Sequence, residues 1–355
     1  MNILREAVDI LLSGHTAAQK LNYLKFITSK RLEEAAYDPV TISIVATTSC
    51  TLSCDMCPTH SARVPRDYSH IQKNVKDIDI RMFREIIDRF RNATTVHIIG
   101  SGEPLLNKDF FKMVDYAAER KMAVKTFSNG TVIRENIDNI LSSRLDGITI
   151  SINGHDAKEF RRMTGMDEAV YSGIYDATER LISEKAKRRS PVKVKLSFII
   201  DKYNYRSIPA MVETTIKLGA DHAFFCSFLP SPYSGLSHDE RVLTAGEGVK
   251  DELNAIFGGY PPFIRKILTP PALVDAKMRK NLCEAHFSQI RFDGDGNVSS
   301  CSMMLLDMRG HGRYDDEGVW NNDFFRKMRR AFLSGDGPAL PEACRVCPDN
   351  KGVVI

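Results

Sequence analysis

The residues with the most specific chemistry in this chain are three cysteines that directly follow a strand-like run, Thr41–Thr48. Cys50 and Cys54 are separated by three residues, and Cys54 and Cys57 by two. Cysteine thiolate is the soft ligand that iron–sulfur clusters select, and a short loop can bring several thiolates to one cluster. Three thiolates can hold three irons of a cubane cluster and leave the fourth iron open. An open iron can bind the amino and carboxylate groups of S-adenosylmethionine (SAM) and pass an electron to its sulfonium, which releases a 5′-deoxyadenosyl radical.

This cysteine spacing resembles the signature of the radical SAM superfamily. The segment Ser101–Pro104 is similar to the family's Gly-Gly-Glu-Pro element, which implies that Gly102 and Glu103 meet the methionine amino group of SAM. Met56 stands where the family usually has an aromatic residue near the adenine, and methionine can fill the same apolar space.

The resemblance extends to the ends of the next two predicted strands. It implies that the ribose and carboxylate of SAM are contacted by Ser128, Asn129, Ser151 and Asn153. Arg161 or Arg162 lies where family members often place an arginine against that carboxylate, and we assign this role to Arg162.

A second set of four cysteines lies near the C-terminus. The run Arg291–Ser300 reads as a hairpin with its turn at Asp293–Asn297, which would bring the flanking Cys283 and Cys301 together. The Cys-x-x-Cys pair Cys344 and Cys347 would complete four thiolates. Such a set can hold zinc or an iron–sulfur cluster, because four thiolates alone do not distinguish the two.

The second set resembles the SPASM/twitch extensions of radical SAM enzymes, with one cluster instead of two because no cysteine follows Cys347. Among these enzymes it looks most like the aminocyclitol dehydrogenase of butirosin biosynthesis. The resemblance implies two [4Fe-4S] clusters, one SAM-binding and one auxiliary, with SAM as the other cofactor.

Alternating strands and helices are predicted to position these residues. An alternation of this kind implies a parallel sheet with right-handed crossovers, and six such units match the partial (β/α)6 TIM-like barrel of the superfamily. The strand candidates are Thr41–Thr48, Thr95–Gly100, Ala123–Ser128, Gly147–Asn153, Val192–Ile200 and His222–Leu229, and helices are expected at Ile80–Arg91, Lys108–Arg120 and Ser207–Leu218. The α/β chain is therefore divided into a helical extension (1–40), the barrel (41–230), a linker with a helical excursion at Gly246–Ile256 (231–282) and a small twitch/SPASM-type iron–sulfur domain (283–355).

The alternation within one strand predicts a polar lumen. Ile148, Ile150 and Ile152 fall on the face toward the helices, and Thr149, Ser151 and Asn153 fall on the face toward the cavity. The first forty residues show helical periodicity and no strand pattern. We expect them to pack against the barrel, and they cannot form the winged-helix domain with which many peptide-modifying relatives bind their substrates.

Composition sets further limits. A formal net charge of +4 over 355 residues gives no case for nucleic acid or a membrane surface as partner. The sequence shows no signal peptide or membrane-spanning run, so a cytoplasmic location is expected. Seven of the eight cysteines lie at metal-ligand spacings, which favours metal over disulfides in that location. The basic run Lys185–Arg189 reads as a solvated helix end or as a docking site for an acidic reductant such as flavodoxin or ferredoxin.

Three other residues are candidates for chemistry in the lumen. Cys226, in the last predicted barrel strand, reads either as a small buried hydrophobe or as a donor of a hydrogen atom to a substrate radical. His60 and His97 read as structural histidines or as acid–base groups.

The sequence thus predicts an enzyme that cleaves SAM and abstracts hydrogen from a polar small molecule of sugar or aminocyclitol type, with oxidation to a ketone favoured. The alternatives are an epimerase that uses Cys226, a peptide-modifying maturase, and a non-catalytic iron–sulfur electron-transfer protein. The last is disfavoured by the motifs at Glu103 and Asn153, which it would leave without a purpose.

Overall fold

The computed structural model describes residues 3–29, 31–62, 64, 76–229, 241–246, 248–275, 283–302, 310–334, 340–345, 347, 350 and 352–353. Its strands are β1 (Thr41–Thr47), β2 (Thr95–Gly100), β3 (Ala123–Ser128), β4 (Gly147–Ser151), β5 (Lys193–Ile200), β6 (His222–Ser227), β7 (Leu268–Thr269), β8 (Leu273–Val274), β9 (Gln289–Phe292), β10 (Val298–Ser299) and β11 (Gly352–Val353). Its longer helices are α1 (Ile3–Leu12), α2 (Ala17–Ser29), α4 (Ile80–Arg89), α5 (Phe110–Glu119), α6 (Ile133–Ser142), α7 (Ala157–Thr164), α8 (Glu168–Arg188), α9 (Ile208–Leu218), α11 (Val249–Gly258) and α14 (Asp323–Ser334). Short helices are α12 (Pro262–Arg265), α13 (Ala285–Ser288) and α15 (Glu342–Arg345).

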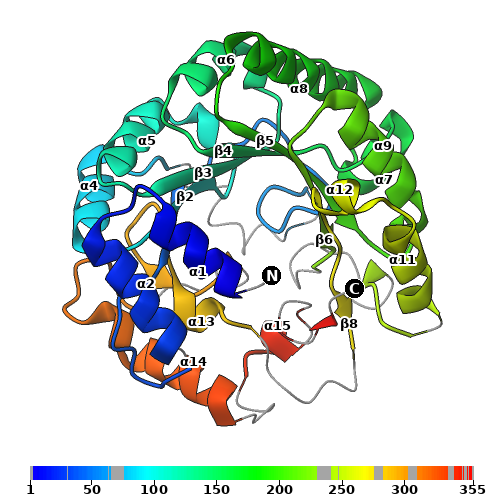
Figure 1. Ribbon diagram of the computed structural model, residues 1–355. Coiled ribbons are helices and arrows are strands. Elements are labelled where there is room, and N and C mark those ends of the chain that lie inside the picture. Colours follow the sequence, from blue (N-terminus) through cyan, green and yellow to red (C-terminus); the bar gives the residue numbers. More distant parts are fainter. Residues whose placement is uncertain are drawn as a thin grey trace.

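Nine of these strands form one curved sheet in the order β10-β9-β1-β2-β3-β4-β5-β6-β7, and β8 and β11 form a separate antiparallel pair. Neighbouring strands from β1 to β7 are parallel, β9 is parallel to β1, and β10 is antiparallel to β9. The helices α4 to α9 lie on the outside of the sheet (Figure 1). The predicted partial barrel is confirmed, and so is the hairpin, which extends the barrel sheet beyond β1. The proposed domain boundaries stay predictions, and much of the predicted linker, residues 231–240 and 276–282, lies outside the described residues.

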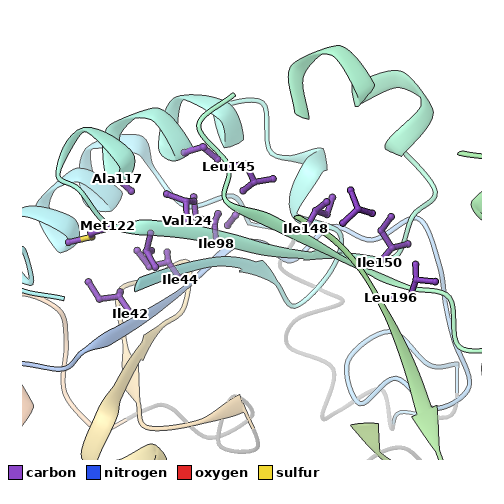
Figure 2. Packing of buried hydrophobic residues seen from close by; sticks show 14 of the residues in the cluster. Ile42, Ile44, Ile98, Ala117, Met122, Val124, Leu145, Ile148, Ile150 and Leu196 are labelled. Carbon is purple, nitrogen blue, oxygen red and sulfur yellow. The ribbon is translucent and has the colours of Figure 1, made fainter. Parts of the chain in front are cut away.

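The hydrophobic core lies between the sheet and its outer helices. Figure 2 shows side chains such as Ile44, Ile98 and Val124 on the helix side of the strands, and these three are fully buried. Ile148 and Ile150 lie on the same side, as their alternation with Thr149 and Ser151 predicts. Each strand therefore buries one face and leaves its other face for the lumen. The sequence placed the end of β4 two residues too late, because Asn153 has a positive φ of 51° that ends the strand.

The N-terminal helices cover the ends of barrel strands, which agrees with the predicted packing role. The fully buried amide of Gln19, on α2, donates to the carbonyl oxygens of Arg91, Ala93 and Arg120 at 2.9–3.1 Å. These carbonyls lie just before β2 and β3. Among the described residues, no strand precedes Thr41 and no helix is long and apolar enough to cross a lipid bilayer.

The basic run Lys185–Arg189 ends α8, and several of its charges have acidic partners. Lys187 bonds to Glu184 at 2.8 Å, Arg188 bonds to Asp138 at 2.7 Å, and Lys185 bonds to Asp221 at 2.5 Å. This arrangement favours a solvated helix end, because paired cations have less charge to offer an acidic reductant.

Candidate active site

The three cysteines of the first set converge in the loop after β1. Cys50, Cys54 and Cys57 are all partly buried, and the amide of Cys57 donates to the carbonyl of Cys54 at 2.9 Å in a tight turn. Burial, followed by the proximity of Cys57 and Cys50, raises the pKa of the Cys54 thiol to about 12. Within the described parts of the chain, no three His, Cys, Asp or Glu side chains are close enough to hold one metal ion. A cubane cluster is compatible with this wider spacing, because each thiolate binds a different iron.

Hydrogen-bond donors already point at two of these sulfur atoms. Asn129 Nδ2 lies 3.6 Å from Cys50 Sγ, and the amide of His60 donates to Cys57 Sγ at 3.3 Å. Donors of this kind stabilise cluster-bound thiolate sulfur. The residues present therefore fit the cluster that the spacing implies.

Backbone hydrogen bonds join the residues after β2 to the start of the cysteine loop. The amide of Glu103 donates to the carbonyl of Ser49 at 2.7 Å, and the amide of Ser101 donates to that of Thr47 at 3.1 Å. A Cβ atom on Gly102 would lie 1.9 Å from the same Ser49 oxygen. Only glycine fits at this approach of two backbones, so the predicted motif has a clear structural reason at Gly102.

Glu103 is fully buried and connects the ends of β2 and β3. Its carboxylate accepts from the amide of Asn129 at 2.6 Å and from the amide of Leu105 at 3.2 Å. Burial raises the pKa of Glu103 to about 6. Asn129 in turn donates to Thr51 Oγ1 at 3.0 Å as well as approaching Cys50. A continuous polar chain thus joins the carboxylate predicted to bind SAM to the loop predicted to bind the cluster.

A cavity of about 430 Å³ opens beside this chain. Of the residues predicted to bind SAM, Gly102, Ser128, Asn129 and Ser151 line it together. Asn153 is buried near the end of β4, where its Oδ1 has no hydrogen-bond partner among the described residues.

Arg162 does not line this cavity. Its guanidinium binds the fully buried carboxylate of Asp201 at 3.0 and 3.3 Å, which fixes the end of α7 to the end of β5. This ion pair could not be predicted from the sequence, because Asp201 follows β5 in a separate segment.

Another contact that sequence reasoning missed docks the cysteine loop on α7. The amide of Asp55 donates to the carbonyl of Thr164 at 2.9 Å. Gly165 caps the helix with a φ of +75°, and a Cβ there would lie 3.0 Å from the Asp55 carboxylate. Glycine after a helix is a recognisable stop signal, but the segment that packs on it is not visible in the sequence.

The second cysteine set is also assembled. Cys344 and Cys347 are buried, and burial followed by the proximity of Cys301 and Cys347 raises the pKa of Cys344 to about 12. The buried Asn350 connects the fourth member to this group: it accepts from the amide of Cys283 at 3.4 Å and donates to the carbonyl of Cys344 at 2.8 Å. Asn350 was not predicted, and its position three residues after Cys347 was the only available signal.

Cys226 lies on the lumen side of β6. The alternate residues Ala223 and Phe225 are buried toward the helices, Phe224 lines a lumen cavity, and Cys226 shares the face of Phe224 and is exposed. The interpretation of Cys226 as a small buried hydrophobe is therefore wrong.

Both candidate histidines are held in the neutral form. Burial lowers the pKa of His60. Burial, with nearby cations as the second cause, lowers the pKa of His97 to about 4.

The fold and site together define a partial parallel barrel with a three-cysteine loop at the carboxyl ends of its strands. Residues 44–214 match the sequence model of the Radical SAM superfamily. The chain therefore carries a radical SAM domain, as its cysteine spacing predicted.

Similar proteins agree with this assignment. Mycofactocin maturase MftC of Mycolicibacterium smegmatis is 23% identical over 331 residues, which cover 90% of this chain and 78% of that protein. The structure of Streptococcus suis SuiB bound to precursor peptide SuiA has a TM-score of 0.63 at 14% identity and covers 87% of this chain and 70% of SuiB. The structure of native anSMEcpe with bound AdoMet has a TM-score of 0.62 at 15% identity and covers 88% of this chain and 89% of anSMEcpe. At these identities the solved structures establish the fold.

Proposed function

We propose that this protein is a radical SAM oxidoreductase that oxidises a polar small molecule, of sugar or aminocyclitol type, bound in the barrel lumen. One observation carries the proposal: residues next to both cysteine sites line the same cavity. Asn129 approaches Cys50 Sγ, Ser302 directly follows Cys301, and both side chains line the cavity of about 430 Å³. A substrate in this cavity would lie between the two sites.

The proposed roles of the chain's residues follow their positions. Cys50, Cys54 and Cys57 would hold a [4Fe-4S] cluster, and Gly102 and Glu103 would bind the methionine amino group. Ser128, Asn129, Ser151 and Asn153 would orient the ribose and carboxylate, and the unpartnered Asn153 Oδ1 is available for such a contact. Arg162 would face the carboxylate with the N–H groups that Asp201 leaves unused. With SAM bound, the cluster supplies a 5′-deoxyadenosyl radical.

The second site would act as the electron acceptor. Abstraction removes one hydrogen atom from a carbinol carbon, and the ketone forms when the substrate radical loses its hydroxyl proton and one electron. Cys283, Cys301, Cys344 and Cys347 would hold the auxiliary cluster that accepts this electron. Asn350 would keep the four cysteines in place.

A second candidate is an epimerase, and the exposure of Cys226 on the lumen face favours it. Its S–H group could return a hydrogen atom to the substrate radical. The thiyl radical left behind would require one electron and one proton from the reductant to complete the cycle.

A third candidate is a peptide-modifying enzyme, supported by the 90% coverage by MftC and by the precursor peptide in the SuiB structure. It predicts a precursor peptide as substrate instead of a small molecule.

The deciding experiment incubates anaerobically reconstituted protein with SAM, a chemical reductant and a panel of sugars and aminocyclitols in D2O. An oxidoreductase gives 5′-deoxyadenosine and a product two mass units lighter. An epimerase gives an inverted product with one carbon-bound deuterium, and Cys226→Ala abolishes that product while SAM cleavage continues. Lack of 5′-deoxyadenosine under every condition would instead support a non-catalytic electron-transfer protein.

A further inference from the structure

The lumen contains a row of basic side chains below the strand ends. The strand register places Arg291 of β9 opposite Ser43 of β1, Ser43 opposite His97 of β2, and His97 opposite Lys125 of β3. Residues that are paired in register on adjacent strands point to the same face of a sheet. Lys195, on β5, lines the same part of the lumen as Lys125.

Arg291 is the most constrained of these cations. It is only 8% exposed, its Nε has no hydrogen-bond partner, and no described carboxylate forms an ion pair with it. Burial lowers the pKa of Arg291 to about 10, and the Cys301 thiolate is the one opposite charge among the described residues that opposes this shift. Guanidinium stays charged at any physiological pH, and a buried charge without a carboxylate partner is costly. Because Arg291 lines the cavity of about 430 Å³, its unused N–H groups are near the space where a substrate would lie.

His97 shows that the basic groups surround a common space. After burial, the causes that lower its pKa to about 4 are the charges of Lys125, Arg291 and Lys195. His97 also lines both the cavity of about 430 Å³, called the upper cavity from here on, and a second cavity of about 660 Å³, called the lower cavity. Lys125 and Lys195 contribute to the lower cavity. A neutral imidazole between three cations can donate a hydrogen bond to a bound anion.

Negative charge is nearly absent from these walls. No described acidic side chain lines the upper cavity, and Asp146 alone among them lines the lower one. Asp146 accepts from the amide of Val124 at 2.7 Å. Asp221 acts on Lys195, but it lines neither cavity and is already paired with Lys185. The positive side chains on the described cavity walls therefore outnumber the negative ones.

We propose that Arg291, Lys125, Lys195 and His97 form a subsite for an oxyanion, so that the substrate is a small molecule bearing a carboxylate or a phosphate. This inference rests on the proposed function and adds the substrate's charge to it. Lys125 lies three residues before Ser128, which is about 10 Å along a strand. An anion held there would leave the rest of the substrate extending toward the residues predicted to bind SAM.

The test measures binding of two probes, inorganic phosphate and acetate, to the reconstituted holoprotein by calorimetry. We expect at least one probe to bind, and the probe that binds more tightly identifies the anion class. Arg291→Gln and the double variant Lys125→Gln/Lys195→Gln should each weaken binding about 10-fold to 100-fold, because each removes charge-assisted hydrogen bonds. Arg265→Gln, an exposed arginine on α12, is the matched control and should bind as the parent does.

Three results would overturn the subsite. Equal binding by the parent and every variant would place the anion elsewhere, and absence of binding by the parent would remove the site. The third result is that Arg291→Gln binds phosphate and acetate as the parent does but shifts the reduction potential of the C-terminal cluster. Arg291 would then interact with the Cys301 thiolate instead of with a bound anion. If Arg291→Gln does not fold, the lysine double variant and Arg291→Lys still test the proposal.

Two further measurements separate this inference from the proposed function. SAM cleavage without substrate reports the function alone, so cleavage without anion binding would overturn only the subsite, and binding without cleavage would overturn only the function. SAM affinity should be unchanged in Arg291→Gln, and a loss of affinity would mean that the cations serve the cofactor.

Discussion

The rim of the barrel and its lumen use polar residues in opposite ways. At the rim, Glu103 and Asn129 are bonded to each other and to the cysteine loop. In the lumen, Arg291 Nε has no hydrogen-bond partner among the described residues, and Lys125 and Lys195 line a cavity to which Asp146 alone contributes a described acidic side chain. A bonded network fixes geometry before a ligand arrives, whereas unpaired buried charge raises the affinity for a ligand of opposite charge. The bonded rim therefore suits the proposed SAM site, and the unpaired charge of the lumen suits the proposed substrate subsite.

The largest expected effect separates the two cysteine sites. Replacing Cys50, Cys54 and Cys57 together by Ala should abolish SAM cleavage and lower the iron content from about eight to about four per chain, because each cubane holds four irons. Iron and sulfide analysis after anaerobic reconstitution measures this, with Cys226→Ala as a control that keeps all its iron.

A parent protein with about four irons, and a triple variant with almost none, would contradict the two-cluster architecture. The second site would then hold zinc or no metal, and the proposed electron acceptor would have to be abandoned.

The next effect concerns the rim network. Glu103→Ala should weaken SAM binding about 10-fold to 100-fold while cluster content stays near the parent value, since a charged hydrogen bond contributes about 1.5–3 kcal/mol. Equilibrium binding of SAM measures the first quantity and iron analysis the second. Glu119→Ala, on the exposed face of α5, is the matched control.

Loss of iron from Glu103→Ala would change this interpretation. It would show that the bonds from Glu103 hold the cysteine loop in place, so that the rim network serves the cluster more than SAM.

The sequence predicted the rim better than the lumen for a physical reason. The cysteines, Glu103 and Asn129 lie in short motifs at strand ends, where local spacing determines which side chains meet. Arg291 reads as an ordinary hairpin residue, because its place beside Ser43 depends on β9 pairing with β1 from the other end of the chain. Asn350 was missed for the same reason, since its contact with Cys283 closes a long stretch of chain.

Asn350 offers a smaller effect at the second cysteine site. Asn350→Ala leaves the amide of Cys283 and the carbonyl of Cys344 without their partner. We expect a loss of about 1–3 kcal/mol in the free energy of unfolding, with weaker metal retention at this site alone. Denaturant unfolding and metal analysis measure these, and the exposed Asn139→Ala serves as the control. Full metal retention in Asn350→Ala would show that the cysteines are positioned without it.

The smallest effect tests the electrostatics of the lumen through His97. Its pKa of about 4 in the folded protein lies below the value of about 6.5 in an unfolded chain. As pH falls from about 6.5 to 4, the unfolded state gains a proton first, so His97 contributes stability above this window that is lost within it. Between pH 7 and pH 5 the loss in the free energy of unfolding should be about 1 kcal/mol after allowance for solvent in the lumen.

Lys125→Gln removes one of the charges that disfavour protonation of His97, so the pKa of His97 should rise and the loss in the free energy of unfolding should shrink. Histidine NMR titration measures the pKa, with His97→Gln assigning the signal, and an unchanged pKa in Lys125→Gln would show that the lumen cations do not share one space.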